Sequence, residues 1–291
     1  IAQGWAAIMI SETLPQKVGF DFSGEIVECG SNVTKFAKGD KIAGLLEVDK
    51  KQSGSFSEFV AVSEEDCIVK IPNGVSPVPV AGLGLAGITA LWCMKPRVKK
   101  DDIVIVRGAS GGVGHFAVQI ARKFGAKQVI AISSHEEFCR SIGATKVVNY
   151  KNVDWFNVLK DTKADVFIDC IGGKEGWPKG KQCLKPNGVF IPVAIDLETK
   201  PTYMSMMSVL LSAINRKFWA FVSNEPAYDM FVSHADTPMM QELMAMVEKK
   251  EISVKIDEKN SPKTFTLESM VEMFRAQTDG KSVCGKLVLE M

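Results

Sequence analysis

The alternation of apolar and polar positions changes character twice along the 291-residue chain. Up to about residue 85, short apolar stretches alternate with Gly, Asp, Asn and Ser, as in residues 24–30 and 57–62. Such spacing is typical of small antiparallel sheets or a barrel, because successive side chains of a strand face opposite sides. The first part of the chain is therefore predicted to be β-rich.

From residue 85 onward, β-branched runs alternate with segments of helical periodicity. Repeated strand–helix–strand units indicate an α/β protein whose parallel sheet is covered by helices on both faces. Helices are expected at 113–124 and 136–142. Strands are expected at 103–107, 128–133, 146–149, 164–169, 188–194 and 218–222.

After about residue 225 the strand–helix alternation stops. Two amphipathic helices are predicted at 238–250 and 265–277, and Thr266 is the expected N-cap of the second. A strand is predicted at 285–290. Because this tail does not extend a parallel sheet in an obvious way, we expect it to return to the N-terminal β-rich part.

Composition and charge exclude several kinds of partner. The chain is 46% hydrophobic and 24% charged, with a formal net charge of +1, as is ordinary for a globular protein. It has no long basic block, which argues against nucleic acid or an anionic membrane surface as a partner. The longest apolar run, residues 204–213, is too short and too broken by Ser to span a bilayer.

The cysteines and the first residue bear on the compartment. The seven cysteines are scattered and form no CxxC pair, which favours a reducing compartment and free thiols. A cytoplasmic location is expected. The sequence opens on Ile1, inside a patterned segment, so we expect a preceding piece, and any organellar targeting peptide would lie there.

A glycine-rich turn at 108–114 carries the strongest chemical signal. Gly108 permits a tight exit from the preceding strand, and Gly114 lets the following helix pack closely on the sheet. The glycines between them let the backbone approach a pyrophosphate, which the helix N-terminus receives with free N–H groups and its positive dipole end. The strand–turn–helix context predicts a dinucleotide site. The turn residues expected to contact the phosphates are Ser110, Gly111, Gly112 and Val113.

The end of the second predicted strand bears on the choice between NAD and NADP. An acidic residue there would hold the ribose 2′-hydroxyl, but this chain has Ser133, Ser134 and His135 instead. Two hydroxyls and an imidazole can donate hydrogen bonds to a 2′-phosphate, so the sequence favours NADPH. Glu136 and Glu137 come next and argue mildly the other way. An alternative is that the two serines only cap the next helix.

Several motifs spread along the chain resemble the medium-chain dehydrogenase/reductase superfamily, and most closely its zinc-free quinone oxidoreductase-like (ζ-crystallin-like) subgroup. They occur in the order that the family has. The matching segments are residues 19–24, 36–40, 54–59, 87–90, 108–114, 148–150, 169–173 and 285–288.

This resemblance implies a Rossmann-type doubly wound parallel sheet inserted in a GroES-like β-barrel domain. The expected boundaries are 1–86 for the first part of the GroES-like substrate domain, 87–225 for the dinucleotide-binding domain and 226–291 for the return. The resemblance also implies that an Asn-Pro segment contacting the nicotinamide precedes residue 1. Trp5 matches a position where the subgroup often has an aromatic pocket residue, although a buried packing role for Trp5 is an equal alternative.

No metal site is predicted. Zinc-dependent relatives carry Gly-His-Glu where this chain has Gly-Phe-Asp at 19–21, and they have a lobe of four closely spaced cysteines that is absent here. The three histidines, His115, His135 and His234, are not paired with Cys or His at ligand spacing.

The resemblance completes the set of candidate cofactor contacts, with Thr89 near the nicotinamide and Tyr150 near the 2′-phosphate. No His or Tyr stands out as a general acid, so no catalytic residue is assigned. The full set is Thr89, Ser110, Gly111, Gly112, Val113, Ser133, Ser134, His135, Tyr150, Ile171 and Val193.

The leading functional hypothesis is a zinc-independent, NADPH-dependent reductase of quinones or α,β-unsaturated carbonyls. One alternative is a 2-enoyl thioester reductase, for which Arg216 and Lys217 offer a small basic patch. Another is an NADPH-binding regulatory or structural protein without turnover, because the sequence reveals no acid. A homodimer is expected, because the apolar strand predicted at 218–222 would form an exposed sheet edge.

Overall fold

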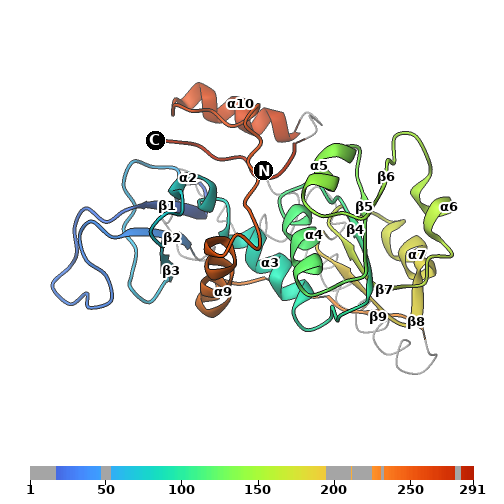
Figure 1. Cartoon of the computed structure of the whole chain (residues 1–291). Coiled ribbons are helices and arrows are strands. Elements are labelled where there is room, and N and C mark those ends of the chain that lie inside the picture. Colours follow the sequence, from blue (N-terminus) through green and yellow to red (C-terminus); the bar gives the residue numbers. More distant parts are fainter. Residues whose placement is uncertain (1–17, 47–53, 195–210, 212–224, 231–232, 279–282) are drawn as a thin grey trace. The chain divides into compact units, whose positions relative to one another are not determined.

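The computed structural model describes residues 18–46, 54–194, 211, 225–230, 233–278 and 283–291. Beyond residue 8, the chain forms two compact units (Figure 1). One unit combines Met9–Leu91 with Ser233–Met291, and the other consists of Trp92–Val232. The second unit is therefore inserted into the sequence of the first.

The inserted unit is built on a six-stranded parallel sheet in the order β6-β5-β4-β7-β8-β9. The strands are β4 (Ile103–Arg107), β5 (Gln128–Ile132), β6 (Lys146–Val148), β7 (Ala164–Asp169), β8 (Leu184–Pro192) and β9 (Ala227–Tyr228). The order reverses between β4 and β7, which is the topological switch point of a doubly wound sheet. The predicted fold class is confirmed.

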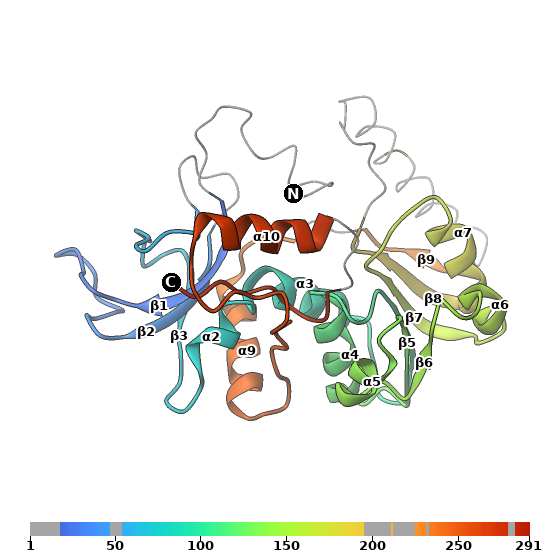
Figure 2. The ribbon, with the colours of Figure 1, turned by 90° about the horizontal axis from the view of Figure 1, so that it is seen from above.

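Helices cover both faces of this sheet, as Figures 1 and 2 show. Helices α4 and α5 lie on one face, and α6 and α7 lie on the other. Their bounds are α4 (Gly114–Lys123), α5 (Glu136–Ser141), α6 (Trp155–Leu159) and α7 (Gly176–Gly180), with a 3₁₀ turn η1 at Lys181–Cys183. Every residue of α4 from Gly114 to Ala121 is buried, because this helix packs on the sheet at its centre.

An aromatic cluster fills the face under α6 and α7. The Phe167 ring stacks on Phe190 with centroids 5.2 Å apart, and Phe190 stacks on Tyr228 at 5.8 Å. Trp177 meets Phe190 edge-on at 5.3 Å, and Trp155 lies 5.9 Å from Phe167. These rings join β7, β8 and β9 to the helices above them, and their burial is a main source of this unit's stability.

The other unit contains a three-stranded antiparallel sheet in the order β1-β2-β3. Its elements are β1 (Asp21–Glu25), β2 (Lys41–Leu45), β3 (Cys67–Lys70), α2 (Pro77–Val80), α9 (Thr237–Glu248) and α10 (Leu267–Thr278), and α3 (Gly84–Met94) runs across the unit boundary. Helix α9 packs against β3. Asp21 accepts a hydrogen bond from the Leu85 backbone N–H at 2.7 Å and pairs with Lys286 at 3.1 Å. Ser233–Met291 therefore belongs to the same compact unit as the β-rich part.

Two predictions about the tail need correction. The strand predicted at 285–290 is wrong, because the segment forms only an isolated bridge between Ile256 and Lys286. The bridge does not grow into a strand because the Val288 N–H donates to the Ser261 hydroxyl at 3.1 Å instead of to a neighbouring strand. Helix α9 begins one residue before the predicted start, where Asp236 caps it by accepting from the Met239 N–H.

The strand predicted at 218–222 lies outside the described residues, and the sixth strand of the parallel sheet that the structure describes is β9. Within the described ranges, no helix is long and apolar enough to cross a membrane.

Candidate functional site

The carboxyl ends of the parallel strands form one continuous hydrogen-bonded edge. The Gly108 N–H donates to the carbonyl that ends β5, and the Ser133 N–H donates to the carbonyl that ends β6, at 3.1 and 3.2 Å. On the other side of β4, the Cys170 N–H donates to the Arg107 carbonyl and the Val193 N–H to the Asp169 carbonyl, at 3.0 and 2.9 Å. Each loop is thus fixed to the end of the neighbouring strand, and this edge is where doubly wound sheets bind ligands.

The glycine-rich turn opens helix α4 at the middle of this edge. Gly108 has φ +77°, a left-handed conformation that favours glycine. A Cβ at Gly114 would collide with the Gly108 carbonyl oxygen, so the helix and the strand exit approach as closely as predicted. A Cβ at Gly111 would meet only that same oxygen at an ordinary 3.4 Å, so the surface of the turn is open there. A tight cradle below and open space above, at a helix N-terminus, fit a bound pyrophosphate.

The structure brings the serine candidates from two strands together. The Ser133 hydroxyl donates to the Ser110 hydroxyl at 2.9 Å and accepts from the His135 backbone N–H at 3.1 Å. Ser134 and the His135 ring lie 3.5 Å apart. Ser133 is only 2% exposed, whereas Ser134 and His135 are half-buried. The end of β5 therefore presents hydroxyls and an imidazole, and no carboxylate, beside the glycine turn.

The remaining candidates of the inserted unit follow the other strands of the same edge. Tyr150 comes two residues after β6 and is 50% exposed. Ile171 follows β7, packs over Gly108 and is 59% exposed, and Val193 follows β8.

Thr89 belongs to the other unit, on helix α3. It is buried, at 6% exposed, and its hydroxyl donates to the Ser233 hydroxyl at 2.9 Å. The Thr89 side chain therefore forms a hydrogen bond to a residue outside its own helix.

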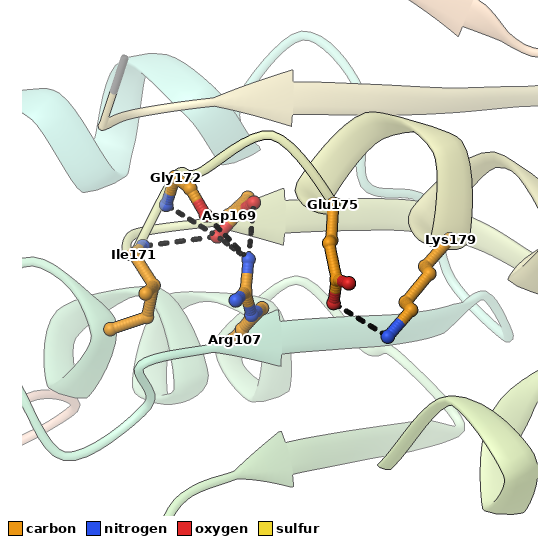
Figure 3. A network of polar contacts seen from close by, with 6 residues as sticks. All are labelled: Arg107, Asp169, Ile171, Gly172, Glu175 and Lys179. Atoms are coloured by element: carbon orange, nitrogen blue, oxygen red, sulfur yellow. Dashed lines mark hydrogen bonds and ion pairs between the residues drawn. The ribbon is translucent and has the colours of Figure 1, made fainter. Parts of the chain in front are cut away.

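An ion pair that was not predicted from the sequence joins the ends of β4 and β7 (Figure 3). Arg107 Nη1 lies 2.9 and 3.2 Å from the two carboxylate oxygens of Asp169 and also donates to the Gly172 carbonyl at 2.8 Å. Asp169 Oδ1 accepts from the backbone N–H groups of Ile171 and Gly172, both at 3.0 Å. The sequence did contain a signal for this ion pair, because opposite charges occupy the last positions of two predicted strands. An arginine at the end of a buried strand needs a partner of opposite charge.

The histidines do not gather. His115 is fully buried in α4, with Nδ1 3.0 Å from the Gly111 carbonyl, and His135 occupies the N-cap position of α5 without a side-chain capping bond. Among the residues that the structure describes, no three His, Cys, Asp or Glu side chains are grouped so that they could hold a metal ion. Both carboxylate oxygens of Asp21, in the 19–21 segment, are engaged by Leu85 and Lys286.

The fold and the glycine-rich edge define a class, the two-unit α/β proteins in which a Rossmann-type sheet is inserted into a GroES-like unit. Comparison with known proteins agrees. The family model described as the alcohol dehydrogenase GroES-like domain matches residues 2–73, and the one described as zinc-binding dehydrogenase matches residues 112–232. The chain belongs to the medium-chain dehydrogenase/reductase superfamily of oxidoreductases.

Individual relatives match over most of the chain. A zinc-type alcohol dehydrogenase-like protein of Schizosaccharomyces pombe is 30% identical over 90% of this chain and 74% of its own length. A quinone oxidoreductase of Pseudomonas aeruginosa is 28% identical over 84% of this chain and 75% of its own. The solved structure of the quinone oxidoreductase from Coxiella burnetii superimposes with a TM-score of 0.79 at 27% identity, covering 99% of this chain and 83% of that one.

Proposed function

We propose that this protein is an NADPH-dependent oxidoreductase that transfers hydride, without zinc, to a quinone or an α,β-unsaturated carbonyl. The observation that carries the proposal is the glycine turn at the sheet's switch point, beside a strand end that carries hydroxyls instead of a carboxylate. The similarity to two quinone oxidoreductases supports the substrate class.

The chain's own residues have defined tasks in this proposal. The turn from Ser110 to Val113 binds the pyrophosphate through backbone N–H groups, and Ser133 with its neighbours receives the 2′-phosphate. The nicotinamide supplies the hydride when it is bound. The protein orients the substrate and excludes water, and the oxygen that gathers negative charge needs a hydrogen-bond donor. No residue is assigned to that donor.

Steady-state oxidation of NADPH in the presence of a quinone, an enone and a 2-enoyl thioester tests this function. We expect turnover with the quinone or the enone, faster with NADPH than with NADH, and no loss of rate after treatment with a chelator. Turnover of the thioester alone would favour the enoyl reductase alternative. Absence of turnover with all acceptors, despite tight nucleotide binding, would favour a regulatory protein. A rate that depends on added zinc would contradict the metal-free proposal.

A homodimer joined at the edge of the parallel sheet is also part of the proposal. Among the described strands, β9 is the outer one beyond β8. An uncovered edge invites pairing with a second copy, and a two-fold axis would continue the sheet. Light scattering should give about twice the chain mass of 31.8 kDa. Phe221→Lys, in the edge strand that the sequence predicts at 218–222, should dissociate the dimer, while a charge reversal at the exposed Glu65 should not. A monomer at micromolar concentrations would reject this assembly.

A further inference from the structure

The Arg107–Asp169 ion pair lies at the one place in the sheet where the strand order reverses. Arg107 ends β4 and Asp169 ends β7, and the two residues are register partners in the parallel ladder. Their side chains therefore meet at the carboxyl ends of the strands, where doubly wound sheets bind ligands, and the Arg107 guanidinium lies 5.4 Å from the centre of the Trp155 ring. Asp169 is 1% exposed and the Arg107 side chain is 17% exposed, so the carboxylate is almost entirely removed from water and the arginine largely so.

The pair fixes the backbone of the loop that follows β7. Asp169 Oδ1 accepts the N–H groups of Ile171 and Gly172, and Arg107 holds the Gly172 carbonyl from the other side. The N–H groups of Ile171 and Gly172 both point at this one oxygen (Figure 3). Gly172 and Gly173 have φ of +75° and +90°, left-handed conformations that favour glycine and that turn the chain away directly after these two bonds.

The result of this arrangement is the placement of Ile171. Its Cδ1 would lie 2.9 Å from a Cβ at Gly108, so the isoleucine packs directly over the first glycine of the phosphate-binding turn. The same side chain remains 59% exposed. An apolar side chain fixed beside the phosphate-binding turn, and still open on one side, is available to contact a ligand bound at that turn.

Simple stabilisation of the fold is a weak explanation for the pair. Burial raises the pKa of the Asp169 carboxyl, and the Arg107 guanidinium and the two backbone N–H groups oppose that rise. A buried ion pair is often no more stabilising than apolar residues of the same volume, so it needs another reason to be present.

We propose that Arg107 and Asp169 are positioning residues for the dinucleotide, because together they hold the Ile171–Gly172 turn over the glycine turn and so shape one wall of the cofactor crevice. This inference rests on the proposed function. It makes the affinity for the nucleotide depend on a pair of side chains that lie beneath the crevice.

Asp169→Asn tests the proposal, with Asp165→Asn as the matched control. The amide keeps the size of Asp169 but turns an N–H₂ group toward the arginine. Asp165 lies on the same strand at the opposite end, accepts the Ile103 N–H at 2.9 Å and pairs with Lys185 at 2.6 Å. Both variants remove one charge from an ion pair and weaken backbone hydrogen bonds, two at Asp169 and one at Asp165. The comparison therefore distinguishes an effect at the proposed site from a general effect on strand β7.

Isothermal titration calorimetry with NADPH, and amide hydrogen exchange without nucleotide, give two independent readouts. Asp169→Asn should raise the Kd by about tenfold and accelerate exchange at Ile171 and Gly172, as expected when a charge-assisted network is lost. Asp165→Asn should leave both unchanged. In turnover, the KM for NADPH should rise in Asp169→Asn while kcat changes by less than about twofold, because the lost interaction is one of binding.

A second variant covers the case in which Asp169→Asn does not fold. Ile171→Ala removes an exposed side chain that the fold does not need, and it should weaken NADPH binding about fivefold or more. Parent protein that binds neither NADPH nor NADH would overturn the proposed function itself. Parent protein that binds tightly, together with an unchanged Kd in Asp169→Asn or in Ile171→Ala, would overturn this inference alone.

Discussion

Two glycines three residues apart in the same turn have different roles. At Gly114 a side chain would meet the carbonyl of Gly108, whereas at Gly111 the nearest atom leaves ordinary van der Waals space. Gly114 is therefore needed by the fold, whereas Gly111 is needed only if a ligand approaches the turn.

Substitutions at these glycines separate the two roles. Gly111→Val should keep the melting temperature within a few degrees and lower NADPH affinity at least about tenfold, because branched bulk occupies the space of the pyrophosphate. Gly114→Ala should destabilise the protein by about 1–3 kcal/mol through overpacking. Thermal unfolding and nucleotide titration measure both effects. Parent-strength binding by Gly111→Val would show that the turn is not the cofactor site.

Ser133→Asp should reverse the choice of nucleotide. The carboxylate can still accept hydrogen bonds from the Ser110 hydroxyl and the His135 N–H, but it repels a 2′-phosphate and can accept from a ribose hydroxyl. We expect the ratio of NADPH to NADH affinity to fall from above one to below one, measured by titration with each nucleotide. Ser141→Asp, at the exposed end of α5, is the control with the same charge change. A parent protein that prefers NADH would contradict this interpretation.

At the scale of single residues, the sequence predicted those residues whose role depends on their immediate neighbours in the chain. The glycines follow from the turn that they form, and Ser133 follows from being at the end of a strand. The partner of Arg107 lies 62 residues away, and only the sheet order brings the two together. Similarly, the hydrogen bond from Thr89 to Ser233 spans 144 positions and has no local signature.

Among the elements, helix α10 offers a direct test of a predicted cap. Thr266 Oγ1 accepts from the Ser269 N–H at 3.0 Å, and Ser269 Oγ accepts from the Thr266 N–H at 2.9 Å, which forms a reciprocal capping box. Thr266→Ala should lower the free energy of unfolding by about 1 kcal/mol. Urea denaturation, with Thr264→Ala at an exposed neighbouring position as the control, measures the difference. Equal stabilities of the two variants would contradict the role of the cap.

Elements were predictable where their pattern was strong. The strands from β4 to β7 lie within the predicted ranges and β8 begins four residues before its predicted start, because each contains a short apolar run with β-branched residues. The segment at 285–290 has the same kind of apolar pattern, yet a hydroxyl from Ser261 takes the N–H that a ladder would use. A side chain distant in sequence decided that outcome, so the pattern alone was insufficient.

At the scale of the whole molecule, the sequence predicted the order of the parts along the chain. The pattern changes from short alternating apolar stretches to repeated strand–helix units, and this alternation stops again in the tail. The resemblance then supplied the type of each part. The predicted domain boundaries at residues 86 and 225 remain predictions. The proton donor also remains unassigned, because no acid group of the described residues is set apart by the site's geometry.

The insertion of one unit into the sequence of the other has a consequence for synthesis on the ribosome. The inserted unit, Trp92–Val232, leaves the ribosome complete while the surrounding unit still lacks Ser233–Met291. Until that tail emerges, Asp21 has no Lys286, and β3 has no α9 to cover it. We expect ribosome-stalled chains that end near residue 270, in which the inserted unit has left the exit tunnel but α9 has not, to resist protease only in the inserted unit. Protection of residues 18–91 in such chains would contradict this order, in which the segment made first is the last to gain its native structure.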